Sequence, residues 1–409
     1  MPAEKIQIAL IKERKNPPDR RVAFSPQQCR EISRQFPQIE FLVEPSLVRC
    51  ISDKEYENQG IRVTDQIQSA GILFGIKEVP VESLINGKIY FFFSHTIKKQ
   101  AHNRKLLQAL LSKRIEMVDY ECLLDEKGNR TVAFGRFAGI VGAYNGLRMW
   151  LQKKAVTTLP PASACPDMAG MIGAVHACIS ALNGLKIVVT GTGRVGQGAM
   201  EVLETLGIKR LDPEAYSEYS GNEAVFTVLS SRHYLQKKDS IPWNEADFRA
   251  HPENYKSNFR RFACCTDLLI SCHYWNPAAP ALFGMEEIAS ADFRISVISD
   301  VTCDIGGSIP TTIRASSIES PFYDIRREDG AEKAAFSSDR HISICAVDNL
   351  PCELPYDASL AFGKMLMQHV IPELVSDHRP GMEGATICRK GELTDRFLFL
   401  KDFAAQQED

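Results

Sequence analysis

The chain has 409 residues, which is too many for one ordinary compact domain and enough for two or three. Hydrophobic residues make up 44% and charged residues 24% of the sequence, so a disordered or fibrous protein is excluded. The net charge is −3 and no long basic segment occurs, so nothing favours a nucleic-acid or membrane partner.

The sequence carries no signal for a membrane span, a leader or a metal site. No apolar run approaches the roughly 20 residues that span a bilayer, and the N-terminus lacks the apolar segment of a signal peptide. The 12 cysteines include no C-x-x-C pair and no metal-ligand spacing. We therefore expect no metal, reduced thiols and a cytoplasmic location.

Short apolar runs alternate with helical patterns along the first third of the chain, which predicts βαβ units and a mostly parallel sheet. Ser25 followed by Pro26 is typical of a helix N-cap and first turn, so a helix is predicted over 26–35. A second helix is predicted over 99–112. Strands are predicted at 6–11, 40–43, 71–76, 89–93 and 115–118.

A second α/β series begins near residue 184. A fully apolar strand at 185–190 runs into a glycine-rich turn and a helical pattern over 195–206. The small-residue helical segment 137–180 is expected to join two lobes, and a further helix is predicted over 358–375. More strands are predicted at 224–229, 268–272, 295–299 and 343–347.

These patterns predict an α/β fold with two Rossmann-like lobes, whose parallel sheets flank a central cleft. Residues 1–144, completed by 347–409, are predicted to form a substrate-binding catalytic lobe. Residues 145–346 are predicted to form the Rossmann lobe that binds a dinucleotide.

The strand at 185–190 is followed by a G-x-G-x-x-G turn at Gly191, Gly193 and Gly196. In a dinucleotide-binding unit these glycines permit a tight turn, let the backbone approach a pyrophosphate and let helix and strand pack closely. Asp212, about 20 positions further on, would bind a ribose 2′-hydroxyl and so favours NAD. Lys209 and Arg210 could instead hold a 2′-phosphate, so NADP is possible.

Polar residues also end two strands of the first lobe. Lys77 and Glu78 end one strand and His95 ends the next, where parallel strands open into a ligand crevice. A partly desolvated lysine and a nearby histidine could work as an acid–base pair. The alternative is a surface lysine and a histidine bonded to a loop carbonyl.

Further charged residues fall at turns and strand ends. The cations Arg21, Lys98, Arg130 and Arg136 are placed as a substrate with carboxylates would need. Asp304 precedes a Gly-Gly turn, where it could face the cleft or cap the turn.

Several motifs resemble those of the lysine-forming saccharopine dehydrogenases. That family includes the lysine–ketoglutarate reductase part of the bifunctional aminoadipate-semialdehyde enzymes, and it lies within the alanine dehydrogenase/transhydrogenase superfamily. The resemblance covers nearly the whole chain. The motifs that carry it lie at 21–26, 75–78, 93–100, 119–121, 132–139, 190–196, 274–275, 300–308 and 347–351.

The resemblance implies roles for individual residues. Lys77 and His95 would be the acid–base pair, with Glu78 and Glu121 setting their charge state. Asn129 and the segment after Asp212 depart from the fungal pattern, so the resemblance does not decide between NAD and NADP. Substrate contacts are implied for Arg21, Lys98, Gln100, Arg130 and Phe134. Cofactor contacts are implied for Gly191, Gly193, Arg194, Val195, Gly196, Asp212, Val301, Asp304 and Asn349.

The implied function is an NAD(P)-dependent oxidoreductase that interconverts saccharopine with L-lysine and 2-oxoglutarate through an imine and a hydride transfer. An alternative is an alanine dehydrogenase-like enzyme that acts on a small 2-oxo acid and ammonia, with Asp304 and His95 as the chemical pair. A catalytically silent dinucleotide sensor is a third hypothesis, and the presence of Lys77, His95 and Asp304 argues against it. Small-molecule substrates are the expected partners; reaction direction and oligomeric state stay open.

Overall fold

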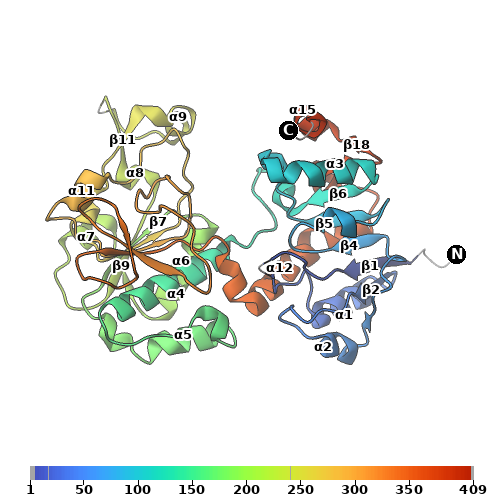
Figure 1. The fold of residues 1–409 in the computed structure, drawn as a ribbon, viewed down its shortest axis with the longest axis horizontal. Helices are drawn as coiled ribbons and strands as arrows, with labels where there is room; N and C mark the ends of the chain where they lie inside the picture. Colours follow the sequence, from blue (N-terminus) through green and yellow to red (C-terminus); the bar gives the residue numbers. More distant parts are fainter. Residues whose placement is uncertain (1–4, 17, 240, 407–409) are drawn as a thin grey trace. The chain divides into compact units, whose positions relative to one another are not determined.

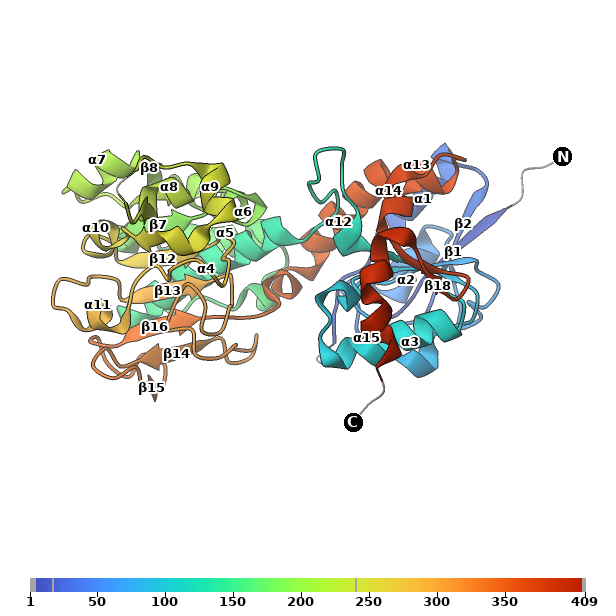
Figure 2. The same cartoon turned by 90° about the horizontal axis from the view of Figure 1, so that it is seen from above.

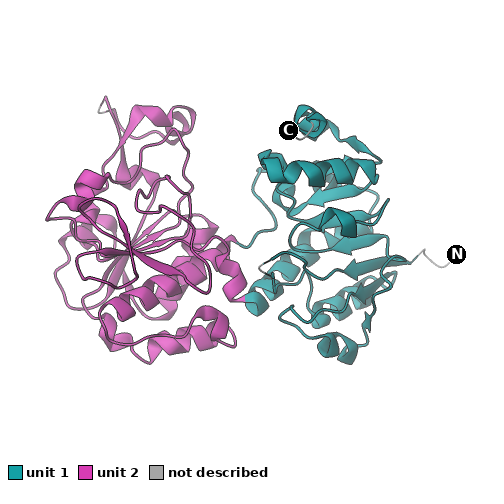
Figure 3. Ribbon diagram, viewed as in Figure 1, with its two compact units in different colours: residues 1–134, 355–409 teal, residues 135–354 magenta. Residues whose placement is uncertain are grey.

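The computed structural model describes residues 5–16, 18–239 and 241–406. The chain forms two compact units (Figure 3). Unit 1 comprises residues 1–134 and 355–409, and unit 2 comprises residues 135–354. These boundaries differ from the predicted ones at 144/145 and 346/347. The reason is that α4 (Gly135–Lys153) packs on α6 (Arg194–Thr205) and on the 3₁₀ turn Leu350–Glu353, which are parts of unit 2.

Unit 1 contains an eight-stranded sheet in the order β18-β17-β6-β5-β4-β1-β2-β3 (Figure 1). Strands β1 to β6 pair in parallel, whereas β17 and β18 add an antiparallel edge beyond β6. Their bounds are β1 Ile6–Leu10, β2 Ile39–Val43, β3 Arg62–Val63, β4 Ile72–Phe74, β5 Ile89–Phe92, β6 Glu116–Asp119, β17 Thr386–Arg389 and β18 Glu392–Leu393.

The helices of unit 1 cover this sheet. Ser25 caps α1 through the Gln28 N–H while the Gln28 side chain accepts from the Ser25 N–H, a capping box that confirms the predicted start. The C-terminal α15 packs on α3 (Figure 2), and Gln108 Nε2 donates to the Ala404 carbonyl at 2.9 Å. The bounds are α1 Pro26–Gln35, α2 Asp53–Asn58, α3 Arg104–Ser112, α12 Pro355–His369, α13 Ile371–Leu374, α14 Pro380–Ala385 and α15 Lys401–Ala405.

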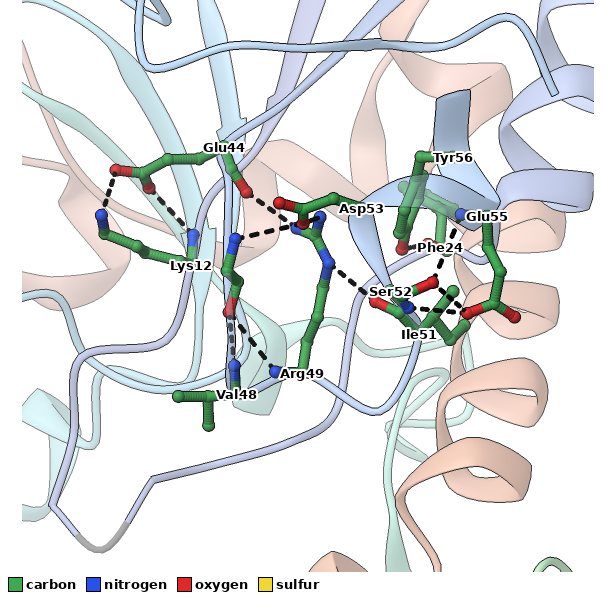
Figure 4. Close-up of polar contacts among 11 residues, drawn as sticks. Lys12, Phe24, Glu44, Val48, Arg49, Ile51, Ser52, Asp53, Glu55 and Tyr56 are labelled. Carbon is green, nitrogen blue, oxygen red and sulfur yellow. Dashed lines mark hydrogen bonds and ion pairs between the residues drawn. The ribbon is translucent and has the colours of Figure 1, made fainter. Parts of the chain in front are cut away.

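A buried polar network fixes the loop between β2 and α2 (Figure 4). Arg49 donates from Nε to the Ile51 carbonyl at 2.9 Å and from Nη1 to the Glu44 carbonyl at 2.8 Å, and its Nη2 pairs with Asp53. The buried Glu44 carboxylate in turn accepts from the Lys12 N–H at 2.9 Å. The chain segments that follow β1 and β2 are therefore held together at one edge of the sheet.

Unit 2 contains a second eight-stranded sheet, in the order β15-β14-β16-β13-β12-β7-β9-β8. The six neighbouring strands β16, β13, β12, β7, β9 and β8 pair in parallel, and β14 and β15 add an antiparallel edge beyond β16. A separate antiparallel pair joins β10 Leu235–Lys237 to β11 Tyr255–Ser257. The sheet strands are β7 Lys186–Thr190, β8 Lys209–Arg210, β9 Val225–Leu229, β12 Leu268–Ser271, β13 Val297–Asp300, β14 Phe322–Ile325, β15 Glu332–Lys333 and β16 Ile342–Cys345.

Glycines let α4 and α6 approach each other closely within unit 2. A Cβ at Gly139 would lie 1.8 Å from the Val195 carbonyl oxygen, and a Cβ at Gly198 would lie 1.9 Å from the Arg136 carbonyl oxygen. Both distances exclude any larger residue without a shift of backbone. The remaining helices are α5 Met168–His176, α7 Pro213–Glu218, α8 Ser231–Tyr234, α9 Glu245–Ala250, α10 Arg260–Ala263 and α11 Met285–Ala289.

The α/β prediction with two mostly parallel sheets is confirmed. Two helix predictions need correction. The segment 99–112 forms a helix only from Arg104, and the segment 358–375 is divided into α12 and α13, since Pro372 lacks the N–H that a continuous helix needs. Across the described part of the chain, no helix combines the length and apolar character needed to cross a membrane.

Candidate functional site

Four polar residues follow neighbouring parallel strands at one edge of the unit 1 sheet. Glu13 follows β1, Lys77 follows β4, His95 follows β5 and Glu121 follows β6. The carboxyl ends of parallel strands meet at one edge, where α/β folds place their ligands. The structure thus brings the predicted Lys77, His95 and Glu121 to the same edge, and it adds Glu13.

Glu13 holds the backbone that carries Lys77. Its two carboxyl oxygens accept from the Ile76 N–H at 2.6 Å and from the Lys77 N–H at 3.0 Å. Burial, and then the neighbouring Asp19 carboxylate, raise the pKa of Glu13 to about 8. A carboxyl group that gains and loses a proton near neutral pH therefore lies beside Lys77. Sequence analysis missed Glu13, although it follows an apolar strand just as Lys77 does.

Glu121 is the centre of an ionic cluster that contains His95. Its Oε2 lies 3.3 Å from His95 Nδ1, and its Oε1 lies 2.7 Å from Arg130 Nη2 and 3.7 Å from Lys98 Nζ. Burial alone would raise the pKa of Glu121, but the hydrogen bond with His95 and the charges of Lys98 and Arg130 lower the pKa to about 2. Glu121 is therefore ionised at neutral pH and can orient the imidazole ring of His95.

Hydrogen bonds fix the backbone around His95. The residue has a φ of 55°, a left-handed conformation that a non-glycine residue adopts at a cost of about 1–3 kcal/mol. Its carbonyl accepts from the Lys98 N–H at 3.0 Å and from Asn103 Nδ2 at 3.2 Å. Asp119 accepts from the N–H groups of Ser94, at 3.2 Å, and Glu121, at 2.8 Å, and so ties the end of β5 to the end of β6.

Glu78 pairs with Lys15, whose Nζ lies 2.8 Å from Glu78 Oε1. Burial alone would raise the pKa of Glu78, but the hydrogen bond from Lys15, a backbone hydrogen bond and the charges of Lys15 and Lys77 together lower that pKa. The second carboxylate oxygen of Glu78 is buried and has no hydrogen-bond partner in the described part of the chain. Glu78 can therefore accept one more donor at this edge of the sheet.

Arg21 and Phe134, two of the residues with an implied substrate contact, lie in contact with each other. The Arg21 guanidinium is 4.1 Å from the centre of the Phe134 ring, and that ring stacks on Phe362 with 4.3 Å between centres. Arg21 also makes two hydrogen bonds to the buried Asp19, at 2.9 and 2.6 Å. Its charge is thus partly balanced within unit 1.

Two further predicted residues, Gln100 and Arg136, take no part in the ionic cluster around Glu121 in the described contacts. Gln100 is exposed, and its Oε1 accepts from Asn103 Nδ2 at 3.5 Å. Arg136 belongs to α4 of unit 2, where its Nε donates to Glu201 at 2.7 Å. Arg136 is therefore paired with a carboxylate of its own unit.

The glycine-rich turn of unit 2 has the geometry that its sequence predicts. Gly191 has a φ of 90°, and a Cβ there would lie 2.7 Å from the His273 Cα. A Cβ at Gly196 would lie 2.0 Å from the Gly191 carbonyl oxygen, whereas a Cβ at Gly193 would enter open space. Gly193 precedes α6 and no side chain caps that helix, so its first N–H groups could hold a phosphate.

A cavity of about 680 Å³ opens at this turn. That volume is within the range of small-molecule and cofactor sites. The shape of the turn and the free space at Gly193 fit the pyrophosphate of a dinucleotide. The lining includes Gly191, Gly193, Arg194, Val195 and Val301 from the predicted cofactor residues, together with Ser230, Ser231, Arg232, Tyr234, Trp243, Phe248, Arg249 and His273, which the sequence did not single out.

His273 lies beneath the glycine-rich turn. It is 8% exposed, its Nδ1 lies 2.7 Å from Thr190 Oγ1, and burial lowers its pKa to about 4. The ring is therefore neutral at pH 7. Its Nε2 is buried and has no hydrogen-bond partner in the described part of unit 2.

Asp212, Asp304 and Asn349 are not part of the cavity lining in the described chain. Asp212 is exposed and directly precedes α7, beyond the end of β8. In the sheet β7 lies between β12 and β9, and β8 pairs only with β9 among the described strands. Asp304 is exposed in a turn, and burial raises its pKa. The expected contact between Asp212 and a ribose thus gains no support from the sheet order.

Two parallel-dominated α/β units, one with a G-x-G-x-x-G turn and the other with polar strand ends, define a two-lobed Rossmann-like protein. The chain belongs to the alanine dehydrogenase/PNT family of oxidoreductases. The pattern of that family's N-terminal domain matches residues 9–141 and the pattern of its C-terminal domain matches residues 158–394.

Curated relatives include two groups of enzymes. The alpha-aminoadipic semialdehyde synthases of Mus musculus and Arabidopsis thaliana are 31% and 30% identical and cover 98% and 96% of this chain. The chain spans only 48% and 41% of their lengths, about half or less. The NAD(+), L-lysine-forming saccharopine dehydrogenase of Yarrowia lipolytica is 24% identical over 81% of this chain and 83% of its own.

Solved structures share the fold. An L-alanine dehydrogenase aligns over 98% of this chain and 100% of its own with a TM-score of 0.67 at 18% identity. The transhydrogenase of Sinorhizobium meliloti aligns over 95% of this chain and 98% of its own with a TM-score of 0.58 at 15% identity. At this identity the likeness concerns the fold alone.

Proposed function

We propose that this chain interconverts saccharopine with L-lysine and 2-oxoglutarate, with a nicotinamide dinucleotide as the redox cofactor. The observation that carries the proposal is the cluster in which Glu121 holds His95, Lys98 and Arg130 at the polar edge of unit 1. The names of the curated relatives, aminoadipic semialdehyde synthase and saccharopine dehydrogenase, support the same substrate class.

The charge at this edge suits an anionic substrate. Saccharopine has three carboxylates, and 2-oxoglutarate has two. The side chains of Lys98 and Arg130 are 46% and 51% exposed, so an anion can reach both charges from solvent at this edge. An alanine dehydrogenase substrate, with a single carboxylate, would leave more of this charge unused.

The acid–base groups suit an imine reaction. The lysine ε-amine must lose a proton before it attacks the keto carbon, and the resulting hydroxyl must gain one before water leaves. His95 and Lys77 are proposed for these two proton transfers. Glu121 orients His95, and the Glu13 carboxyl group gains or loses a proton beside Lys77. The dinucleotide, when bound, supplies the hydride that reduces the imine carbon.

The test is the oxidation of NADH and NADPH, measured at 340 nm with L-lysine plus 2-oxoglutarate and, separately, with pyruvate plus ammonia. Turnover that requires both lysine and 2-oxoglutarate supports the proposal. Turnover with pyruvate and ammonia alone would favour the alanine dehydrogenase-like alternative. The cytoplasmic location and the NAD preference stay predictions, and the mammalian relatives are named as mitochondrial.

A further inference from the structure

We propose that the C-terminal segment, residues 395–406, holds the loop of residues 95–103 in position, and that Phe399 is its anchor on Lys99. The loop carries His95 and Lys98, so the consequence for catalysis rests on the proposed function. The attachment itself lies within unit 1 and is tested separately. Phe399 is thus a positioning residue, which acts on the chemistry through the loop.

The loop has a strained backbone at two positions. His95 and Lys99 have φ angles of 55° and 52°, so left-handed residues flank the 3₁₀ turn Thr96–Lys98 on both sides. Each such residue lowers the population of the ordered loop by roughly five- to 150-fold, and it persists only where its surroundings impose it. Within the loop, the N–H groups of Lys98 and Lys99 donate to the carbonyls of His95 and Thr96 at 3.0 and 3.1 Å. Contacts from outside the loop are therefore needed to keep it ordered.

The C-terminal segment is a firm support for such contacts. It begins with the 3₁₀ turn Asp395–Leu400, in which the side chains of Phe397 and Leu400 are buried. Arg396 Nη1 donates to the Gly384 carbonyl at 2.7 Å. The turn is therefore fixed to the body of unit 1 before the chain continues into α15.

One attachment between the segment and the loop runs through the start of α3, beside which α15 lies (Figure 2). The Arg104 guanidinium is 5.2 Å from the centre of the Phe403 ring, and its Nη2 donates to Gln406 Oε1 at 2.7 Å. Arg104 directly follows Asn103, whose Nδ2 donates to the His95 carbonyl at 3.2 Å. The end of the loop is thus tied to the C-terminal segment.

The second attachment is direct. Lys99 Nζ lies 5.2 Å from the centre of the Phe399 ring. Phe399 and its neighbour Leu398 are 51% and 53% exposed, and a single exposed apolar side chain needs no explanation. Phe399 differs from Leu398 because its ring lies beneath an ammonium group. A cation–π contact at an exposed site changes an equilibrium by about two- to fivefold, so Phe399 stabilises the loop next to Lys98.

The experiment begins with amide hydrogen exchange of residues 95–103 in the full chain, measured by mass spectrometry without any ligand. Phe399→Ala should speed this exchange by about two- to fivefold, because the exchange rate reports the opening equilibrium of the loop. Phe399→Tyr keeps a ring and should restore the parent rate. Leu398→Ala is the matched control, since Leu398 is equally exposed on the same turn, and it should leave the rate unchanged.

A double-mutant cycle tests whether Lys99 is the partner of Phe399. Lys99→Met should speed the exchange as Phe399→Ala does, and the double variant should exchange no faster than either single variant. Additive effects of the two substitutions would overturn the pairing of Phe399 with Lys99.

Steady-state kinetics separates positioning from a merely structural role. Phe399→Ala should raise the KM for 2-oxoglutarate by about two- to fivefold, because Lys98 is held in place in fewer molecules. The dinucleotide affinity and the melting temperature should stay unchanged, since the contact lies on the exposed side of unit 1. Phe399→Tyr should restore the KM, whereas a structural role would lower the melting temperature without this separation.

Unchanged exchange in Phe399→Ala would overturn the anchoring. Faster exchange with an unchanged KM would overturn the positioning role. If the parent chain shows no turnover with lysine and 2-oxoglutarate, the proposed function fails and the positioning role fails with it. In that case the exchange experiment still decides whether the C-terminal segment holds the loop.

Discussion

Replacement of Glu121 by glutamine tests the ionic cluster on which the proposed function depends. The Glu121 side chain is 7% exposed, and its pKa falls from 4.5 to about 2 in the folded chain. That difference corresponds to about 3 kcal/mol of stability at neutral pH. Because the side chains of Lys98 and Arg130 are 46% and 51% exposed, solvent screens part of it, and we expect Glu121→Gln to lower the free energy of unfolding by about 1–2 kcal/mol at pH 7.

The sign of the pH dependence follows from the lowered pKa. The contribution of Glu121 is complete above pH 4.5 and is lost as the pH falls towards 2, so the gap between parent and variant should narrow between pH 7 and pH 3.5. Urea unfolding at the two pH values measures the difference in free energy of unfolding between the parent chain and the variant. Glu126→Gln is the matched control, since Glu126 is exposed on the same loop. Equal stability of parent and Glu121→Gln at pH 7, or a gap that is the same at pH 3.5, would refute the reasoning.

Three further predictions concern separate parts of the molecule. Lys77→Met should lower kcat by about 10²–10⁴-fold and leave dinucleotide affinity within about threefold, and a loss of turnover under threefold would remove Lys77 from the chemistry. Gly193→Ala should fold normally but bind the dinucleotide at least tenfold more weakly in calorimetry, because the new methyl group enters the open space at the turn. Gly198→Ala should instead destabilise unit 2 in thermal unfolding, because its Cβ would lie 1.9 Å from a carbonyl oxygen. Burial raises the pKa of Glu353 from 4.5 to about 7, so the folded chain keeps a proton that the unfolded chain releases. The free energy of unfolding should therefore fall by up to about 3 kcal/mol between pH 5 and 7.5. Glu353→Gln should flatten this pH dependence in urea unfolding, and an unchanged pH dependence would contradict the assignment.

The longer parallel strands could be predicted because most of their residues are buried. The runs at β1, β5, β7 and β12 are apolar at almost every position, and such runs have few alternatives in a chain of this composition. The antiparallel edge strands β14, β15, β17 and β18 gave no comparable signal. Two of them have only two residues, β15 and β18, and their pairing depends on neighbours far away in sequence. Tertiary pairing, which local patterns do not encode, decides such strands.

The candidate site divides in the same way between local and long-range causes. Lys77 and His95 could be predicted because a polar residue directly after an apolar strand is a local feature. Glu13 has that feature too, but its importance comes from accepting the N–H groups of residues more than 60 positions away, which only the fold reveals.

The ribose residue shows why the order of strands in space matters more than their order in sequence. Asp212 follows β8, the second strand of unit 2 in sequence, at the distance from the glycines at which an acidic ribose contact is expected. The strand that lies between β7 and β8 in the sheet, however, is β9, which comes later in the sequence. Because β9 lies between β7 and β8, Asp212 is one strand further from the glycine-rich turn, and Ser231 and Arg232, which follow β9, line the cavity. Because Arg232 lines the cavity and Asp212 does not, Asp212→Ala should change the affinity for a dinucleotide less than Arg232→Ala does, and titration calorimetry measures both.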